Sequence, residues 1–323
     1  MSRFSTLLLA VLLIMPVFWV PLPSASSAPA TAAGPPASES DWTRHRLVAH
    51  GMGEIEGYTY TNTMEAFKLN YAKGYRLFEV DLQLTADGYL VTRHDWQPYL
   101  YRQLGQTAPK AGRLGLPLSR KEAVSILVHG AYRTLDFEGL LVLLRQYPDA
   151  TFITDTKDTD PATVRRQFAA MKEAARDEPE LLRRIVPQFY NQAMYAEIES
   201  VHRFESYIYT LYMSPDTEAQ TLSFVRAHPR VAAVTMPESL ANAGYLRRLE
   251  DAGVHTYIHT INDTEDMLRY IDQGAHGFYT DSISEIQLAS ANASPPSYLT
   301  MLANAVRELY AEPVMSFWPH RWF

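Results

Sequence analysis

Two acidic side chains inside one apolar segment are the first sign of chemistry in this sequence. Glu79 and Asp81 lie two residues apart in the segment 77–84, and side chains at that spacing share one face of a β-strand. Phe78 and Val80 would then face the packing side. Two ionised carboxylates at close range repel each other, and a divalent cation such as Mg2+ or Ca2+ would remove that cost. The alternative is one carboxylate in a salt bridge and the other exposed at the strand end.

A second apolar segment, at 151–154, leads into Asp155 and Lys157. These two side chains would also share a strand face. Asp155 is therefore a candidate third metal ligand, and Lys157 is a candidate contact for a phosphate oxygen. The alternative is that the two side chains only pair with each other.

Histidines follow two further apolar segments. His50 comes directly after the short run 47–49, and His94 follows a short β segment at 89–92. An Asp-Gly turn before 89–92 would fold that segment back beside 77–84 as a hairpin. Two histidines and two carboxylates would thus converge at one place, although a single histidine at a strand end often serves only as a structural hydrogen-bonding group.

Other polar residues are weaker candidates. Gln188 and Tyr190 share a strand face, and His259 shares one face of a later strand with His255 and Tyr257, near the opposite side of the barrel. We expect Gln188, Tyr190 and His259 to line the pocket or to be satisfied core groups. Asp281, at the end of the last predicted strand, is expected to be structural.

The elements that would position these groups alternate along the chain. Strands are predicted at 47–49, 77–84, 151–154, 185–189, 207–211, 231–235, 254–261 and 277–280, with 89–92 as an extra hairpin strand. Helices are predicted at 64–73, 137–146, 161–176, 217–227, 239–252 and 264–273. Repeated β-then-α units favour a single-domain (β/α)8 TIM barrel with a β-hairpin insertion after the second strand. A doubly wound open sheet is the alternative.

The composition limits the class of protein. The chain has 323 residues, 47% of them hydrophobic, which is sufficient for a barrel of about 250 residues. The formal net charge of -7 argues against a nucleic-acid partner. The absence of cysteine excludes disulfides, thiolate metal ligands and a cysteine nucleophile.

The N-terminus carries a targeting signal. Arg3 precedes an apolar run at 7–22, and a stretch rich in Ser, Ala and Pro follows. We expect residues 1–30 to be a secretory signal peptide or an uncleaved membrane anchor, residues 31–45 a linker, and residues 46–323 the barrel with its C-terminal helix and tail. Either N-terminal alternative places the folded domain outside the cytoplasm, as a secreted, periplasmic or membrane-anchored protein.

Two other segments lie outside the repeating pattern. The segment 97–136 is long for a loop and would cover one mouth of the barrel. Near the C-terminus, a helix is predicted at 298–310, and the chain ends in the aromatic segment 317–323. That end would pack on the barrel or contact a partner or a membrane.

Several motifs together point to one family. They are His50-Gly51, Thr61-Asn62-Thr63-Met64-Glu65-Ala66-Phe67, Phe78-Glu79-Val80-Asp81, Thr85-Ala86-Asp87-Gly88, Val91-Thr92-Arg93-His94-Asp95, Thr260-Ile261-Asn262-Asp263 and Gly274-Ala275-His276-Gly277-Phe278-Tyr279-Thr280-Asp281. In order and spacing, from residue 46 to residue 284, they resemble the glycerophosphodiester phosphodiesterase family of the phospholipase C-like phosphodiesterase superfamily.

The resemblance implies a (β/α)8 phosphodiesterase with one divalent metal ion. The matching metal ligands are Glu79, Asp81 and Asp155. His50 and His94 would be the general acid and base, since imidazole titrates near neutral pH. The metal ion and Lys157 would stabilise charge on the phosphoryl oxygens. Attack by a substrate hydroxyl would give a cyclic phosphate that water can open.

The chain also departs from the family pattern. Gly51 and Met52 stand where the family usually has Arg and Gly, and Thr61 stands where it usually has Glu. Asp155 replaces the usual Glu, which is similar to the sphingomyelinase D group. Arg93 is a candidate phosphate-binding residue that would replace the missing positive charge. The sequence therefore indicates a divergent branch of the superfamily.

These observations predict a metal-dependent phosphodiester hydrolase. Its substrate would be a glycerophosphodiester, a phospholipid head group or a polyol phosphate, with contact to a membrane surface as a further expectation and no protein partner inferred. The alternatives are a catalytically degenerate barrel that binds a phosphoester or a cell-envelope component, and another metal-dependent barrel enzyme such as a sugar isomerase.

Overall fold

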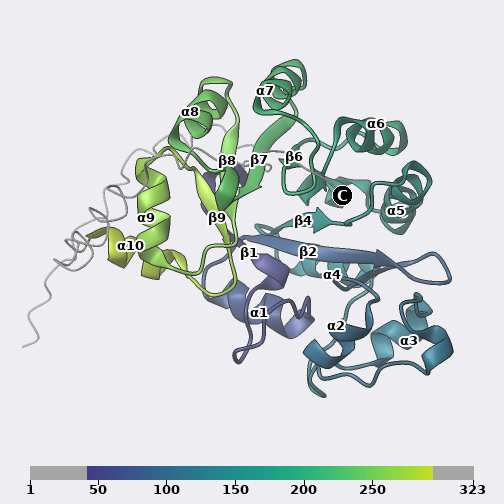
Figure 1. Cartoon of the computed structure of the whole chain (residues 1–323). Coiled ribbons are helices and arrows are strands. Elements are labelled where there is room, and N and C mark those ends of the chain that lie inside the picture. The colour runs from purple at the N-terminus through teal and green to yellow at the C-terminus, as the bar shows by residue number, and fades with distance from the viewer. Residues whose placement is uncertain (1–41, 294–323) are drawn as a thin grey trace, which may run out of the picture. The chain divides into compact units, whose positions relative to one another are not determined.

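Eight parallel strands close into a barrel in the computed structural model, which describes residues 42–293 (Figure 1). The ring consists of β1 (Leu47–Ala49), β2 (Leu77–Leu84), β4 (Thr151–Asp155), β5 (Ile185–Phe189), β6 (Tyr207–Thr210), β7 (Val231–Pro237), β8 (His255–His259) and β9 (Gly277–Thr280). β1 pairs with both β2 and β9, which closes the ring. The predicted (β/α)8 TIM barrel is therefore confirmed, and the open sheet is excluded.

One strand lies outside the ring. β3 (Leu90–Thr92) pairs antiparallel with β2, and the register places Leu82 opposite Thr92. The amide of Arg93 then donates to the carbonyl of Asp81 at 3.0 Å. The hairpin therefore returns the chain to the end of β2, so that the residues after β3 lie beside the inward side chains of β2.

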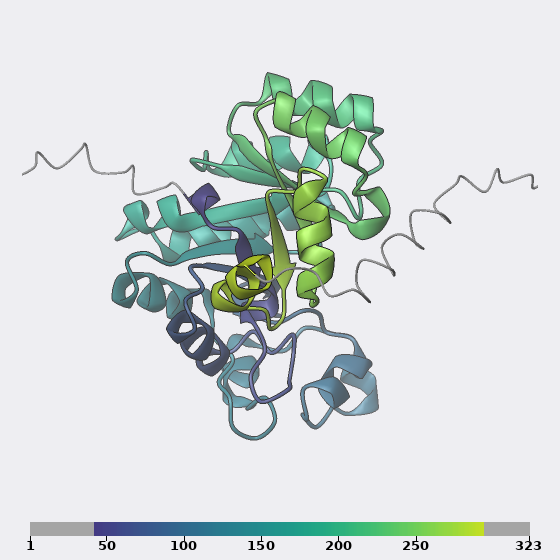
Figure 2. The same ribbon diagram turned by 90° about the vertical axis from the view of Figure 1, so that its left-hand side faces the viewer.

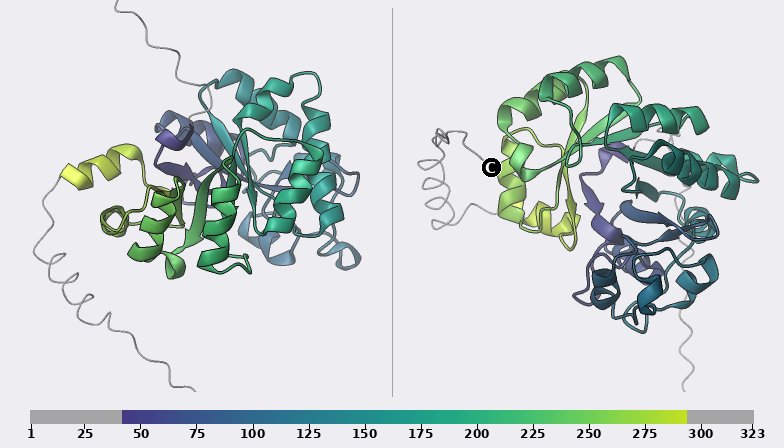
Figure 3. Two further views of the ribbon diagram at one scale, coloured as in Figure 1. Left: turned by 90° about the horizontal axis from the view of Figure 1, so that it is seen from above. Right: turned by 45° about the vertical axis from the view of Figure 1, so that its right-hand side comes forward.

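Helices cover the outside of the barrel (Figures 2 and 3). They are α1 (Met64–Ala72), α4 (Phe137–Gln146), α5 (Pro161–Ala174), α6 (Gln192–Val201), α7 (Glu218–Ala227), α8 (Ala243–Asp251), α9 (Thr264–Asp272) and α10 (Glu285–Ala293). All six predicted helices in this part of the chain are present, whereas α6 and α10 were not predicted. The helix predicted at 239–252 begins later, at Ala243, because Asn242 caps it and a short 3-10 turn at Glu238–Leu240 precedes it.

Most of these helices begin at a polar side chain that accepts a hydrogen bond from the first turn. The capping residues are Thr63, Asp136, Asp160, Asn191, Thr217, Asn242 and Asp263. At α1 the cap is Thr63, which leaves the side chain of the neighbouring Asn62 for a function inside the barrel.

The barrel interior is packed at its N-terminal end. Inward apolar residues from every ring strand form one buried cluster: Val48, Leu77, Ile153, Val186, Ile208, Ala233, Tyr257 and Tyr279, together with Trp42. The indole of Trp42 stacks on Tyr257 at a centroid distance of 6.0 Å and donates to the hydroxyl of Ser206 at 2.7 Å. Since this end is filled by side chains, polar inward residues are left to gather at the opposite end, where barrel active sites are built.

The segment 97–136 folds as a small unit rather than a bare loop. It contains α2 (Pro98–Gln103) and α3 (Arg120–Ser125), and its residues join the buried cluster Val91, Trp96, Tyr101, Leu118 and Ala123. Two of its side chains contact the loop after β1. Tyr132 donates a hydrogen bond to Glu56 at 2.6 Å, and the ring of His129 stacks on Tyr58 at 3.5 Å. The segment therefore supports the loop that leads from β1 to α1.

The N-terminal boundary of the domain differs from the expectation. Trp42–Arg44 forms a short 3-10 helix, and Trp42 is only 4% exposed against the barrel base, so residues assigned to the 31–45 linker belong to the folded domain. The N-terminal segment 1–30, the helix predicted at 298–310 and the aromatic end 317–323 lie outside the described residues. Within residues 42–293, none of the helices combines the length and apolar character required to cross a membrane.

We expect Trp42→Ala to lower the free energy of unfolding by about 3 to 5 kcal/mol, because it opens a cavity under Tyr257 and leaves the Ser206 hydroxyl without its donor. Chemical denaturation would measure the change. Leu69→Ala, on the exposed face of α1, is the control and should cost less than about 0.5 kcal/mol. A Trp42 variant as stable as this control would contradict the assignment of Trp42 to the core.

Candidate active site

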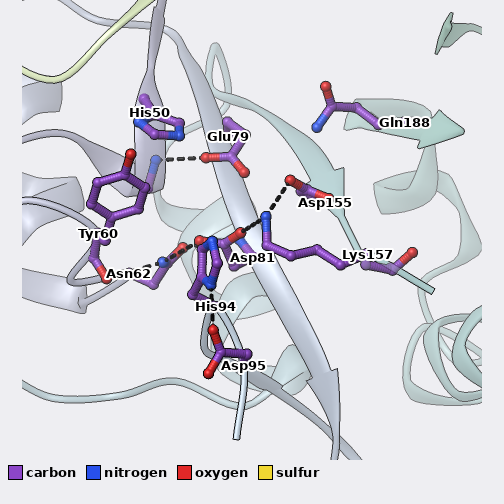
Figure 4. A network of polar contacts seen from close by, with 12 residues as sticks. His50, Tyr60, Asn62, Glu79, Asp81, His94, Asp95, Asp155, Lys157 and Gln188 are labelled. Atoms are coloured by element: carbon purple, nitrogen blue, oxygen red, sulfur yellow. Dashed lines mark hydrogen bonds and ion pairs between the residues drawn. The ribbon is translucent and has the colours of Figure 1, made fainter. Parts of the chain in front are cut away.

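Three carboxylates meet inside the barrel at the C-terminal ends of two neighbouring strands (Figure 4). Glu79 and Asp81 project inward from β2, and the register places Asp81 directly opposite Asp155 of β4. Their exposed fractions are 1%, 1% and 6%. One oxygen from each lies within 4.8 Å of the other two. Neither β2 carboxylate is exposed, so the alternative of an exposed strand-end residue does not apply.

Lys157 reaches back into this group of carboxylates. Its Nζ lies 2.8 Å from Oδ1 of Asp81 and 2.6 Å from Oδ2 of Asp155. The backbone of Lys157 has a positive φ of 58°, which is uncommon for a residue with a side chain and directs the chain sharply at the end of β4. The pairing of Lys157 with Asp155 is therefore present, but it is part of a larger group with three acids and one ammonium.

Burial and mutual repulsion determine the charge state of the carboxylates. Burial and the neighbouring charge of Asp81 raise the pKa of Glu79 to about 8. Burial would also raise the pKa of Asp81, but the ammonium of Lys157 lowers it below the ordinary value. The group therefore carries more negative than positive charge once Glu79 is ionised. Three converging carboxylates, with oxygen donors only, fit a hard divalent cation, so Glu79, Asp81 and Asp155 could hold one metal ion.

Each of the three carboxylates accepts a hydrogen bond from a donor outside the group. Asn62 donates from Nδ2 to Oδ2 of Asp81 at 2.8 Å, while the amide of Asp81 donates back to Oδ1 of Asn62 at 2.9 Å. The amide of Gly51 donates to Oε2 of Glu79 at 2.6 Å. The hydroxyl of Tyr190 donates to Asp155. These bonds hold the carboxylate oxygens in place, which is how surrounding groups orient metal ligands.

His50 lies above Glu79 and is paired with Asp281 at the end of β9. Its Nδ1 is 2.9 Å from Oδ1 of Asp281, and Asn262 donates to the other oxygen of that carboxylate at 2.6 Å. These contacts keep the pKa of Asp281 below its ordinary value although burial opposes them. An ionised carboxylate only accepts hydrogen bonds, so Nδ1 of His50 must donate, and Nε2 remains for a reactant.

The surroundings of His50 favour its protonated form. Burial by itself would lower the pKa of the imidazole. The hydrogen bond with Asp281 and the charges of Glu79, Asp281 and Asp81 outweigh burial and raise the pKa to about 9. At neutral pH the ring therefore holds a proton on each nitrogen.

His94 has a similar arrangement on the other side of the carboxylates. Its Nδ1 lies 2.7 Å from Oδ2 of Asp95, and the hydroxyl of Tyr99 donates to the same carboxylate. The second ring nitrogen faces Asp81 in Figure 4. The structure thus brings together both predicted histidines and all three predicted ligands, each histidine with its own carboxylate partner.

The three predicted pocket residues occupy different positions. Tyr190 is fully buried behind Asp155 and acts on it through the hydroxyl. Gln188 is buried on β5, where its Oε1 accepts from Thr210 at 2.9 Å and from Tyr279 at 3.0 Å. His259 has a buried Nε2 with no hydrogen-bond partner among residues 42–293, and burial lowers its pKa to about 4. His259 is therefore a neutral imidazole at the barrel mouth.

Arg93 does not point at the carboxylates. Its Nε donates to the carbonyl of Asp95 at 2.6 Å, and its Nη1 donates to Gln106 at 2.9 Å. The guanidinium lies over the rings of Trp96 and Tyr101 at 5.1 and 4.3 Å. The phosphate contact expected for Arg93 therefore has no support in this geometry, because alternation along β3 turns the side chain into the apolar cluster of the 97–136 segment.

Sequence reasoning missed the partners that orient the reactive groups. Asp281 was expected to be structural, yet it bonds the imidazole of His50. Asn62 binds Asp81, and Asn262 binds Asp281, by the same two hydrogen bonds. In each pair the asparagine Nδ2 donates to the aspartate carboxylate, and the asparagine Oδ1 accepts from the backbone amide of that aspartate. Each asparagine precedes its aspartate by 19 residues. That repeated spacing, and the presence of all four residues in the motifs that resemble the family, were the available signals.

The family model described as "Glycerophosphoryl diester phosphodiesterase family" matches residues 55–285. Since this match covers more than half of the chain, the chain belongs to that family and is a phosphoric diester hydrolase. No curated protein matches the chain at a significant level.

Solved structures support the same fold. A glycerophosphodiester phosphodiesterase from Parabacteroides distasonis is 17% identical, with a TM-score of 0.60 over 77% of this chain and 98% of that one. A phosphodiesterase from Oleispira antarctica, in complex with the product sn-glycerol-3-phosphate, is 17% identical, with a TM-score of 0.61 over 77% and 97%. A glycerophosphodiester phosphodiesterase from Thermotoga maritima is 18% identical, with a TM-score of 0.54 over 76% and 97%. At sequence identities this low, the structural similarity shows the fold alone.

We expect Asp281→Asn to lower the pKa of His50 by about 1 to 3 units, because the imidazolium loses an adjacent negative charge and its acceptor. An NMR titration of the His50 Cε1–H resonance would measure the shift. Asp272→Asn, on the exposed surface of α9, should leave that pKa unchanged. An unchanged His50 pKa in Asp281→Asn, with the fold intact by circular dichroism, would contradict the pairing.

Proposed function

We propose that this member of the glycerophosphoryl diester phosphodiesterase family is a metal-dependent hydrolase with His50 and His94 as its general acid and base. One observation carries the proposal. Two imidazoles, each bonded through Nδ1 to a carboxylate, stand beside three buried carboxylates at one mouth of the barrel. A protein that only binds a ligand has no need for two oriented imidazoles, whereas phosphoryl transfer needs one proton acceptor and one proton donor.

The metal ion in this proposal is Mg2+ or Ca2+, and Glu79, Asp81 and Asp155 would hold it. When bound, such an ion neutralises charge that builds up on the phosphoryl oxygens. It would also supply the positive charge that Lys157 now supplies to Asp81 and Asp155. The ammonium could then turn to a phosphoryl oxygen, which is the role that the sequence predicted for it.

The two histidines divide the proton transfers. The raised pKa of His50 keeps a proton on its Nε2 at neutral pH, which suits it to protonate the leaving alkoxide. His94 would then accept the proton of the attacking hydroxyl. As the new P–O bond forms, the bond from phosphorus to the leaving oxygen breaks, so one proton enters His94 and one leaves His50.

The proposed substrate is a glycerophosphodiester, with a phospholipid head group or a polyol phosphate as related choices. The related Oleispira enzyme was solved with sn-glycerol-3-phosphate, which supports a glycerol-containing substrate. Attack by a neighbouring hydroxyl of the substrate itself would release an alcohol and form a cyclic phosphate. In a second step, water would attack the cyclic phosphate and open the ring. The two histidines would then exchange their roles as acid and base.

We also propose that the enzyme acts outside the cytoplasm, at or near a membrane surface. The apolar run at 7–22 and the stretch rich in Ser, Ala and Pro that follows it support export. A lipid-derived substrate would agree with that location.

We expect the purified protein to hydrolyse bis(p-nitrophenyl) phosphate and a glycerophosphodiester only when Mg2+ or Ca2+ is present. His50→Ala and His94→Ala should each lower kcat by about 100-fold or more, because a proton-transfer group is lost. His202→Ala, at the C-terminal end of α6, is the matched control and should retain the wild-type kcat. Wild-type protein that neither turns over these diesters nor binds a metal would favour the degenerate binding barrel.

We expect metal affinity to rise between pH 6 and pH 8, because the metal ion competes with the proton that Glu79 retains below its pKa of about 8. Isothermal titration with Mg2+ and Ca2+ would measure the dissociation constants. Glu79→Gln should weaken binding and flatten the pH dependence, whereas Glu173→Gln on the surface of α5 should do neither. Binding that is independent of pH in wild-type protein would argue against Glu79 as a ligand.

A further inference from the structure

Tyr60 lies between the two histidines of the site (Figure 4). Its ring centroid is 4.7 Å from that of His50 and 5.7 Å from that of His94. The ring planes meet at 79° and 81°, so both contacts are edge-to-face. In residues 42–293, Tyr60 is the one aromatic side chain that makes a ring contact with either of these histidines.

The backbone holds Tyr60 in an uncommon conformation. Its φ is 57°, in the left-handed region that residues with side chains seldom adopt. Gly51 makes this possible, because a Cβ at that position would lie 3.0 Å from the Cα of Tyr60. Two neighbours along the loop, Glu56 and Tyr58, are tied to the 97–136 segment by the contacts described above. The loop is therefore built to keep Tyr60 at this place.

The carboxylate partners do not fix the tilt of either imidazole ring. Asp281 and Asp95 each bond one atom, Nδ1, and so hold a proton on that nitrogen of His50 and of His94. A bond to one atom allows the ring plane to tilt about that atom, and the tilt moves Nε2. The ring of Tyr60 supplies a further contact that limits the tilt, and it is shared by both histidines.

We propose that Tyr60 is a positioning residue that keeps the His50 and His94 rings at a fixed separation and tilt, so that both Nε2 atoms face one phosphoryl group. The ring rather than the hydroxyl has this role, because the Tyr60 hydroxyl has no hydrogen-bond partner among the described residues and both contacts are made by the ring. The inference rests on the proposed function, in which both histidines transfer a proton in a single displacement.

Tyr60→Leu and Tyr60→Phe test the role of the ring. Neither replacement is β-branched, so the positive φ disfavours both of them about as much as tyrosine. We expect Tyr60→Leu to lower kcat by about 10- to 100-fold with KM changed less than about threefold, because small displacements of reacting groups cost rate rather than binding. Tyr60→Phe should keep kcat within about threefold. Tyr89→Leu, at an exposed position directly before β3 where the ring packs on Arg120, is the control and should keep the wild-type kcat.

Two kinetic results would overturn the inference while the proposed function stands. One is a Tyr60→Leu variant with wild-type kcat. The other is a Tyr60→Phe variant as impaired as Tyr60→Leu, which would assign the effect to the hydroxyl. Wild-type protein without turnover would instead count against the proposed function.

A readout that does not depend on turnover separates failure of the Tyr60 inference from failure of the proposed function. In protein labelled with 13C at histidine Cε1, the His50 and His94 resonances should broaden or split in Tyr60→Leu, as their rings gain freedom, and stay sharp in Tyr60→Phe and Tyr89→Leu. Unchanged His50 and His94 resonances in a folded Tyr60→Leu variant would overturn the positioning role. If Tyr60→Leu does not fold, Tyr60→Met provides the same comparison with an unbranched and more flexible side chain of similar volume.

Discussion

The mutual repulsion of three buried carboxylates is the constraint on which the rest of this structure depends. Glu79, Asp81 and Asp155 converge because β2 and β4 are neighbours in parallel register and present acids at the same height. Such a group is unfavourable in an apolar interior unless cations and hydrogen-bond donors offset it. Lys157 and the donors at Gly51, Asn62 and Tyr190 supply that compensation, and they come from four different places along the chain.

The closure of the barrel and the chemistry of the site are linked. His50 follows β1, the first ring strand, and Asp281 follows β9, the last one. The two residues meet only because β1 and β9 are paired. An open sheet would separate the imidazole from its carboxylate and remove the influence that raises its pKa. The contact that completes the fold therefore also favours the protonated form of His50, the proposed general acid.

The loop after β1 shows how a departure from the family pattern is accommodated. Gly51 has no cationic side chain, but its amide binds Glu79 and its lack of a Cβ allows Tyr60 to approach. Met52 is fully buried in the outer core and cannot contact a phosphate. Positive charge at the carboxylates thus comes from Lys157, whereas Arg93 is held against Trp96 and Tyr101. The ring of Tyr60 contacts both histidines and holds their relative orientation.

The sequence by itself determined the barrel, most element boundaries and the five residues that were expected to converge, because alternation within strands decides which side chains share a face and the order of strands decides which ends meet. The tertiary structure alone decided the partners. Asp281 with His50, Asn62 with Asp81 and Tyr60 with both histidines are contacts between segments that no local pattern joins. The direction of Arg93 also depended on the apolar cluster that the 97–136 segment builds around it. The alternation of side chains along a strand decides which face each residue occupies, whereas the contacts of a loop depend on the segments that pack against it.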